Sequence, residues 1–502
     1  MLSIFATTEY IDDVHAIVQS IDRLSELVSI YDSFQHAPTA AYNSLMIDHR
    51  GILCPIDWQN GGPPYLLPAK LAFQKEVLLG LIFARLGNME WASNHLSDHT
   101  ALLAELETVH RLFNGGIVQL PATASSSDAF ENYRTAHNTA ILQHYGQLEQ
   151  PADLGQIRDS YAQALAAAPN SEHRAYTVSQ FATLLLDAGE VALAEKMLSE
   201  AVQEAISEEA RHKLQTILTQ AWMKQLTVPY DQKLLERLKN TLWESLQFYE
   251  RNDRQAEMGL LLLDAAHIAN ISDSFSESLG YISRAERIFE AQEMIELQGS
   301  THLRKGTLLY TWAQKGNPQF YKPALEAYQR ALKIFRQEVA PDIFADIHHN
   351  LAILYAEMPA EQKKRGIWAG ISATSFQEAL NYYTKENFPY QYGMICNNFG
   401  NALMKFPAAI HSDNYEKALF YYQEALDVRT ANVPYERSIT LLNFLEASWN
   451  VSNAQETFNE DRYKDMLTKA EEIQTLVEDA DMLAEAQKHL ALLKELKETV
   501  SR

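Results

Sequence analysis

Glycine and proline are scarce in this chain, which has 19 glycines and 16 prolines among 502 residues. Together they make up about 7% of the sequence, against about 12% in average proteins. Because these residues interrupt helices, their scarcity over so long a chain favours a mostly helical protein. A chain of this length also exceeds the usual limit of one hydrophobic core, so we expect several cores or an elongated array.

Cysteine and positive charge are also in short supply. The two cysteines, Cys54 and Cys396, lie far apart in the sequence, which excludes a disulfide framework and a multi-thiolate metal site. Lysine and arginine number 42 against 65 aspartates and glutamates, which gives a net charge of −23. This excess of negative charge repels phosphate backbones and anionic lipids, so we expect no direct nucleic-acid partner.

Long apolar runs are missing as well. No stretch reaches the roughly 18 apolar residues that a membrane-spanning helix needs. The first residues, MLSIFATTEYIDDV, carry acids where a secretory signal needs basic residues. We therefore expect a soluble, cytoplasmic protein without membrane insertion, and no motif indicates a cofactor.

Internal repeats with helical spacing run through the sequence. From Leu79 to Leu96, and again from Ala182 to Ala201, small and large apolar residues recur one turn apart on both sides of a glycine turn. Small residues let two antiparallel helices approach closely, and large ones fill the space between them. A second-helix motif, an aromatic or leucine with alanine three positions later, begins at Tyr161, Tyr328, Phe376, Tyr422 and Leu467.

The helices that precede these motifs share an asparagine at one register. The segment HNLAILYAEMP, which starts at His349, aligns with NNFGNALMKFP from Asn397 and more loosely with LNFLEASWN from Leu442. An earlier segment, HNTAILQHYG from His137, matches the first of these at five positions. The shared asparagines of the three later segments are Asn350, Asn398 and Asn443.

These helix pairs resemble the tetratricopeptide repeat family, and the later units resemble kinesin-light-chain-type repeats and tetratricopeptide arrays of bacterial signalling proteins. The resemblance implies an all-α fold: a right-handed superhelical solenoid of antiparallel helix pairs with a C-terminal capping helix. It is strong at 73–106, 175–208 and 298–477. It is weak at 211–291, where the small-residue signature is poor.

The repeat pattern predicts five segments. Residues 1–68 do not fit the repeat, and we expect them to form a helical and loop-rich segment with one amphipathic helix near Val14 to Leu24. The other segments are a first repeat unit with a linker (69–127), partly degenerate helical repeats (128–297), a tetratricopeptide array (298–479) and the capping helix (480–502).

Residues that could catalyse a reaction or bind a metal are few. His95 and His99 lie one helical turn apart, but no further metal ligands are evident nearby, so the sequence favours an exposed polar face. No nucleophile elbow, phosphate loop or dinucleotide motif is present. An enzyme with its site in the first 68 residues would depend on weak suspects, which are Asp48, His49, Cys54 and Asp57. We expect neither catalysis nor a metal site.

The asparagine register is the feature best suited to binding. A side-chain amide both donates and accepts, so a row of amides can pair with an extended peptide backbone of any sequence. In the tetratricopeptide family the first helices line the concave surface, and their asparagines contact bound peptides. The resemblance therefore implies as binding residues Asn350, Asn398 and Asn443, with Asn397, Asn401, Arg304 and Lys405 as neighbours. The alternative is that these asparagines bond to adjacent helices and only fix the superhelix.

A basic cluster lies between Ala360 and Thr374, where the array contains an insertion. Its members are Lys363, Lys364, Arg365 and Trp368. An exposed cluster of this kind would dock an acidic partner. The alternative is a solvated loop without a binding role.

Taken together, these features predict a non-catalytic scaffold that binds an extended peptide or a helix of a partner protein in a concave groove. The alternative is a sensor or regulatory subunit, in which ligand binding changes the superhelix and thereby controls a separate enzyme. The two functions differ in whether binding changes the shape of the array.

Overall fold

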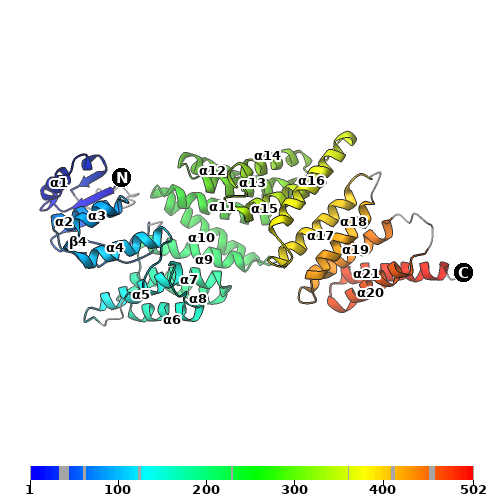
Figure 1. Ribbon diagram of the computed structural model, residues 1–502, viewed down its shortest axis with the longest axis horizontal. Coiled ribbons are helices and arrows are strands. Elements are labelled where there is room, and N and C mark those ends of the chain that lie inside the picture. Colours follow the sequence, from blue (N-terminus) through cyan, green and yellow to red (C-terminus); the bar gives the residue numbers. More distant parts are fainter. Residues whose placement is uncertain are drawn as a thin grey trace. The chain divides into compact units, whose positions relative to one another are not determined.

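The computed structural model describes residues 2–32, 44–59, 64–121, 126–227, 230–359, 361–408, 413–451 and 458–500. Figure 1 follows the chain from its N-terminal strands through successive helices to the C-terminal helix. The chain divides into two compact units, Met1–Ile268 (unit 1) and Ala269–Arg502 (unit 2). Each unit contains its own hydrophobic core.

Unit 1 begins with a five-stranded sheet in the order β2-β1-β3-β4-β5. The helix α1 (Ile11–Gln19) and the short helix η1 (Leu24–Glu26) connect β1 to β2. β1 pairs in parallel with β2 and β3, whereas β3 with β4 and β4 with β5 are antiparallel. The strands are β1 (Leu2–Ala6), β2 (Val28–Tyr31), β3 (Ser44–Asp48), β4 (Gly51–Leu53) and β5 (Lys70–Leu71).

This sheet corrects the expectation of a helical and loop-rich segment over residues 1–68. The expected amphipathic helix is present as α1, but it ends at Gln19. The strands contain only two to five residues, which is too short for an alternating pattern to be distinguished in the sequence. Ile4, Ile47 and Ile52 from the sheet are fully buried and share one core with helix α2.

The helices of unit 1 pack in consecutive pairs: α2 with α3, α5 with α6, α7 with α8 and α9 with α10. The turns within the first and third of these pairs hold Gly87 and Gly189 at φ of 80° and 78°, a conformation that glycine adopts without strain. The helices are α2 (Lys75–Arg85), α3 (Met89–His95), α4 (Thr100–Phe113), α5 (Ala129–Tyr145), α6 (Leu154–Ala167), α7 (Ser171–Asp187), α8 (Val191–Val202), α9 (Glu208–Lys224), α10 (Gln232–Arg251) and α11 (Gln255–Ile271), which contains the unit boundary.

Unit 2 continues with the pairs α13 and α14, α15 and α16, α17 and α18, and α19 and α20. The first helices of successive pairs also contact one another, and α21 packs on α19 and α20 as the predicted capping helix. None of the described helices in either unit is long and apolar enough to cross a membrane. The helices of unit 2 are α12 (Phe275–Ala291), α13 (Ile295–Gln314), α14 (Tyr321–Ile334), α15 (Pro341–Glu357), α16 (Gln362–Tyr382), α17 (Pro389–Lys405), α18 (Asn414–Val428), α19 (Pro434–Asn450), α20 (Glu460–Leu476) and α21 (Ala480–Val500).

Glycines on the first helices explain how these pairs pack so closely. A Cβ atom on Gly400 would lie 2.4 Å from the ring of Tyr422, and one on Gly306 would lie 2.7 Å from the ring of Tyr328. Each tyrosine ring therefore rests directly on the backbone of the first helix. The Tyr422 hydroxyl then donates to Asn401 Oδ1 at 2.7 Å. The predicted pairing of small and aromatic residues is confirmed.

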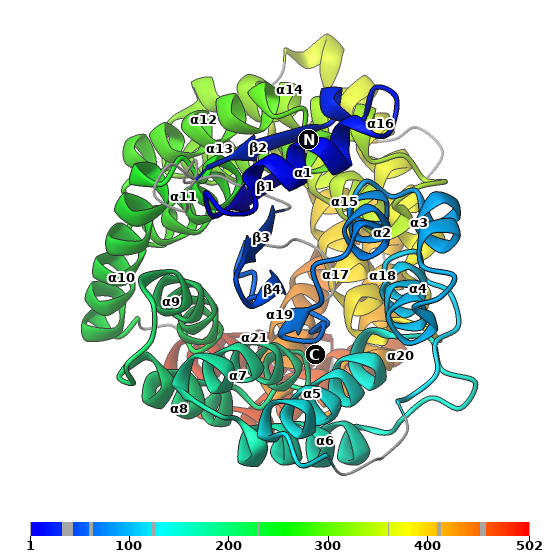
Figure 2. The same ribbon diagram turned by 90° about the vertical axis from the view of Figure 1, so that its left-hand side faces the viewer.

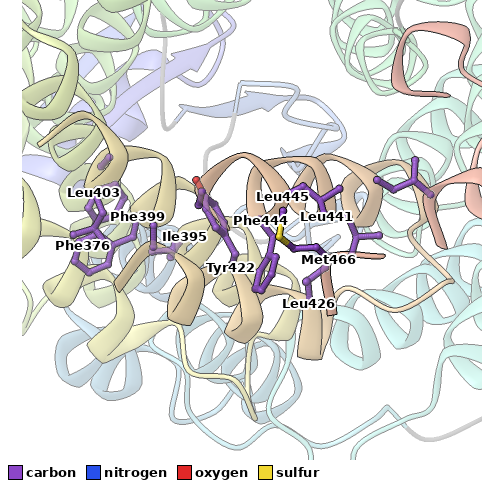
Figure 3. Packing of buried hydrophobic residues seen from close by; sticks show 14 of the residues in the cluster. Phe376, Ile395, Phe399, Leu403, Tyr422, Leu426, Leu441, Phe444, Leu445 and Met466 are labelled. Atoms are coloured by element: carbon purple, nitrogen blue, oxygen red, sulfur yellow. The ribbon is translucent and has the colours of Figure 1, made fainter. Parts of the chain in front are cut away.

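The core of unit 2 is continuous from α15 to α21. Figure 3 shows Phe376 and Phe399 near one end of this core, Tyr422 next to them, and Leu441 and Met466 farther along it. The rings of Phe376 and Phe399 are stacked with centroids 4.6 Å apart. Because neighbouring pairs share one core, each pair stabilises the next, as expected of a repeat array.

Prolines set the register of the later first helices. Pro341, Pro389 and Pro434 each occupy the first position of α15, α17 and α19. Proline is favoured there because the first turn of a helix does not use its backbone N–H, and the fixed φ angle suits the helix. Counting from these prolines, Asn350, Asn398 and Asn443 all stand nine residues later, which places them on equivalent faces of the three helices.

Candidate peptide-binding face

The first helices carry a position, here named the row position, nine residues after the first residue of the helix. In α15, α17 and α19 it holds the three asparagines of the sequence register. In α13, which begins at Ile295, it holds Arg304. In α5 of unit 1, which begins at Ala129, it holds Asn138. The five residues thus occupy equivalent positions on five first helices, one in unit 1 and four in unit 2.

In unit 2 the asparagines of α17 and α19 form a chain of hydrogen bonds between helices. Asn443 Nδ2 donates to Asn397 Oδ1 at 3.0 Å, and Asn397 Nδ2 lies 3.5 Å from Asn398 Oδ1. Asn398 Nδ2 in turn lies 3.1 Å from Nε2 of His349 on α15. Three successive first helices are therefore joined by one chain of hydrogen bonds, here called the relay. Such contacts are what we expect if the asparagines bond to adjacent helices and fix the superhelix.

The relay ends on a buried, neutral histidine. Only 7% of His349 is exposed, and this burial lowers its pKa from 6.5 to about 4. An amide nitrogen can only donate, so the Nε2 atom of His349 accepts from Asn398 and the ring proton sits on Nδ1. The imidazole is thus held in one tautomer at neutral pH.

Asn350 and Arg304 occupy the same row position but are not part of this relay. Asn350 is half-buried on α15, and Arg304 is exposed on α13, the neighbouring first helix. Within the described residues, neither side chain makes a hydrogen bond or ion pair with another part of the chain. These two side chains are therefore available for an external ligand.

Lys405, which the sequence places among the neighbours of the binding asparagines, already has an acidic partner. Its Nζ atom lies 2.8 Å from Oε1 of Glu357 on α15. The other oxygen of Glu357 accepts from the Tyr310 hydroxyl and from Gln314 Nε2. Burial raises the pKa of Glu357, but the hydrogen bonds from Lys405, Tyr310 and Gln314 outweigh it and lower the pKa overall. Lys405 thus joins first helices of unit 2, and this ion pair neutralises its charge.

The basic cluster lies on a helix, so its interpretation as a solvated loop is wrong. Helix α16 begins at Gln362 and places Lys363, Lys364 and Arg365 in its first turn, all exposed. Trp368 is half-buried and packs edge to face with Tyr355, with ring centroids 6.5 Å apart. The helix runs through Gly366 and Gly370, where an added Cβ atom would meet nothing within 4 Å. A docking role for these residues stays a prediction.

In unit 1 a long hairpin loop, residues 54–69, connects β4 to β5 and reaches the repeat helices. The two strands pair directly through Ile52 with Leu71, and the loop closes where Cys54 N donates to Ala69 O at 3.1 Å. The described residues of the loop are 54–59 and 64–69. Figure 2 shows β4 together with the helices α5, α7 and α9, from which side chains contact this loop.

Asn138, at the row position of α5, binds the backbone of this loop with both ends of its amide. Leu66 N donates to Asn138 Oδ1 at 2.8 Å, and Asn138 Nδ2 donates to Leu66 O at 2.8 Å. The two residues are 72 positions apart in sequence, and both are buried. One amide of α5 thus pairs with both main-chain groups of a residue in a distant segment of the same chain.

His137 extends the contact by one residue along the loop. Its Nε2 atom donates to Pro64 O at 2.8 Å, because a carbonyl can only accept, and its Nδ1 atom accepts from Thr177 on α7 at 2.9 Å. The ring is fully buried, which lowers its pKa from 6.5 to about 4. His137 is therefore a neutral link between the loop and two first helices.

Further contacts fix the aromatic residues of the loop. Trp58 Nε1 donates to Glu172 Oε1 at 2.7 Å, and the Trp58 ring packs edge to face on Tyr176 of α7. The Tyr65 hydroxyl donates to Glu105 at 3.0 Å. Arg134 of α5 lies 2.7 Å from the same Glu105 and also donates to Leu66 O at 3.3 Å.

Asn138 and the loop are not among the binding residues predicted from the sequence. The signal was present in the match of HNTAILQHYG to HNLAILYAEMP, which aligns Asn138 with Asn350. The loop could not be assigned in the same way, because its partners lie 72 positions away and share no motif with it.

Two of the weak suspects for catalysis, Asp48 and Asp57, have structural partners. Asp48 pairs with Arg50 at 2.6 Å, and Asp57 accepts from the backbone of Gln59. Burial raises the pKa of the Cys54 thiol to about 11, which disfavours the reactive thiolate. The ring of His95 stacks on Phe83. Among the described residues no group of three or more His, Cys, Asp or Glu side chains could hold a metal ion.

The packed helix pairs give the chain a tetratricopeptide-type repeat fold. No protein-family model and no curated protein sequence matches it. Among solved structures, it is similar to yeast Tom70, with 10% identity over 85% of this chain and 82% of that one and a TM-score of 0.38. It is also similar to a signal transduction ATPase with numerous domains and a tetratricopeptide repeat sensor from Pyrococcus horikoshii, with 11% identity, coverage of 99% and 81%, and a TM-score of 0.38. A third similar structure is BtubC of P. vanneervenii, with 15% identity, coverage of 57% and 97%, and a TM-score of 0.32.

Proposed function

We propose that the protein is a non-catalytic interaction scaffold that holds an extended segment of a partner protein along the row positions of unit 2. The observation that carries this proposal is the two-bond contact of Asn138 with the backbone of Leu66. There, an asparagine at this position on a first helix accepts from one backbone N–H and donates to one backbone carbonyl. Asn350 is the equivalent residue in unit 2.

The residues around Asn350 suggest the chemistry of the ligand. The amide of Asn350 can accept from one backbone N–H and donate to one carbonyl. Arg304, at the row position of the adjacent first helix, can pair with a carboxylate through two parallel hydrogen bonds. The partner segment would therefore be extended and would carry an acidic side chain close to the residue that Asn350 binds. Lys405 is not needed for this role because Glu357 neutralises it.

The regulatory alternative is supported by a different observation. The relay from Asn443 to His349 joins α19, α17 and α15, and the Glu357 cluster joins α17, α15 and α13. A ligand on one first helix would perturb hydrogen bonds to the next, which would couple binding to the superhelix. The two functions are separated by whether binding changes hydrogen exchange at helices that the ligand does not touch.

The experiment selects peptides from a phage-displayed random library on the full-length chain and maps their binding by amide hydrogen exchange. We expect selected peptides to contain acidic residues and to protect α13 and α15. The double variant Arg304→Ala and Asn350→Ala should lose most of this binding, about tenfold or more. The matched control is Asn381→Ala, an exposed asparagine on the second helix α16. Peptides that bind equally well to the double variant would contradict the proposal.

A further inference from the structure

We infer that the face of α5, α7 and α9 in unit 1 is a second peptide-binding site, which the hairpin loop occupies and from which an external extended segment can displace it. The expected occupant is a segment of a partner protein with the chemistry of the loop, an extended Pro-Tyr-Leu sequence. The inference shares with the proposed function only the premise that row asparagines bind backbone, and its site lies entirely in unit 1.

The length of the loop is the first observation. Strands as closely paired as β4 and β5 need a connection of only two to five residues. The connection from 54 to 69 is far longer, although its two ends are joined by a hydrogen bond between Cys54 and Ala69. The additional length is used to reach α5, α7 and α9, the last through Gln59 Nε2, which donates to Glu209 Oε1 at 3.4 Å. The pairing of β4 with β5 lies outside the contacts with the helices, so it can persist when the loop leaves the face.

The second observation is that three side chains of α5 bind the backbone of the loop. Asn138 bonds to the N–H and the carbonyl of Leu66, His137 donates to the carbonyl of Pro64, and Arg134 donates to the carbonyl of Leu66. Main-chain groups are the same in every peptide, so these side chains would hold another extended segment equally well. Such contacts are how an extended peptide gains affinity without a fixed sequence.

The remaining contacts define which side chains the site prefers. Leu66 is 6% exposed, so the face offers a buried position for a leucine. The carboxylates of Glu105 and Glu172 accept from the Tyr65 hydroxyl and the Trp58 ring N–H. A competing segment therefore needs a buried aliphatic residue beside an aromatic donor. An acidic segment of the type proposed for unit 2 would be repelled here.

The loop also has the advantage of being attached to its site. An attached ligand competes with an effective concentration in the millimolar range, so a free peptide must be abundant or bind more tightly to replace it. The site would thus be closed to weak ligands and would open to a partner that is abundant or binds tightly.

The experiment uses a fluorescent synthetic peptide with the sequence of residues 54–69 and the full-length protein. The loop variant Trp58→Ala and Leu66→Ala weakens the attached competitor and leaves Asn138, His137 and Arg134 in place. We expect this variant to bind the peptide at least about tenfold more tightly than the unaltered protein does. In the unaltered protein, excess peptide should increase hydrogen exchange of residues 64–68 while α5 and α7 stay protected.

A pair of peptides makes the test specific for the backbone contact. N-methylation at Leu66 removes the N–H that donates to Asn138, whereas N-methylation at Leu67 removes an N–H that has no hydrogen bond among the described residues. The first modification should weaken binding about tenfold or more relative to the second. Equal binding of the two peptides would overturn the inference.

Two further outcomes separate this inference from the proposed function. If a loop variant with unchanged circular dichroism does not bind the peptide, the loop is a fixed structural element and the inference fails. Asn350→Ala should leave peptide binding unchanged, because that residue belongs to unit 2. Loss of binding in Asn350→Ala, with retention in Asn138→Ala, would overturn the inference and leave the proposed function standing.

Discussion

The same helix position is used differently in the two units. In unit 1, Asn138 turns its amide to the backbone of a loop 72 positions away, whereas in unit 2 Asn398 and Asn443 turn theirs to neighbouring first helices. The repeat therefore supplies an amide at a fixed place, and the neighbours decide what it binds. A common register in a repeat protein identifies equivalent positions and does not by itself assign them a common role.

The residue just before the row position explains much of this difference. In α17 this residue is Asn397, whose Oδ1 accepts from Asn443. In α15 it is His349, whose Nε2 accepts from Asn398. In α5 it is His137, which donates to the loop instead. Asn350 stands out because, within the described part of the chain, no neighbour supplies it with a partner.

Acidification should have the largest effect, and it tests both units at once. His137 and His349 are buried and neutral in the folded chain, with pKa values of about 4 against 6.5 when unfolded. The unfolded state therefore binds more protons below pH 6.5, and the stability that these rings contribute is lost as the pH falls from 6.5 to 4. Over this range, each ring should lower the free energy of unfolding by about 3 kcal/mol.

The measurement is urea unfolding at pH 7 and pH 4.5, followed by hydrogen exchange in each unit. His137→Gln should reduce the acid sensitivity of unit 1, and His349→Gln that of unit 2. The control is His15→Gln, at an exposed position on α1. If each glutamine variant altered both units equally, the two histidines would not belong to separate cooperative units.

Asn138→Ala should have the next largest effect, because it leaves the buried N–H of Leu66 without a partner and its carbonyl with only the 3.3 Å hydrogen bond from Arg134. Each unpaired buried group costs about 1 to 3 kcal/mol, so docking of the loop should weaken by about 2 to 3 kcal/mol. Hydrogen exchange of residues 64–68 should accelerate while the α5 to α8 pairs keep their protection. Unchanged protection of Leu66 would indicate that Trp58 and Tyr65 hold the loop without the amide.

The sequence predicts the helical repeats well because their signals are local. Glycine opposite tyrosine, as in Gly400 with Tyr422, and proline at the first position, as in Pro389, both act within one helix pair. The sheet is not predicted because its strands are short. The contact of Asn138 with Leu66 is not predicted because it depends on two segments that are distant in sequence. Local sequence patterns thus predict the helix pairs but not the contacts between segments that are distant in sequence.

Asn397→Ala should have a moderate effect in unit 2, because it breaks the relay at its centre. The substitution removes the acceptor of Asn443 and one donor to Asn398. We expect a loss of about 1 to 2 kcal/mol in the stability of unit 2, measured by urea unfolding. In a double-mutant cycle with Asn443→Ala, the two losses should be less than additive. Full additivity would mean that the two amides do not act through each other.

Asn350→Ala should have the smallest effect on stability and sharpens the comparison most. Asn350 shares its register with Asn138, but no part of the described chain bonds to its amide, so its removal should change the unfolding free energy by less than about 0.5 kcal/mol. Asn138→Ala, at the equivalent position, should cost several times more. The same Asn350→Ala variant should nevertheless lose affinity for acidic peptides selected on unit 2. A side chain that contributes little to folding but much to binding has a role in ligand binding. A large loss of stability in Asn350→Ala would instead show that Asn350, like Asn398 and Asn443, stabilises the scaffold.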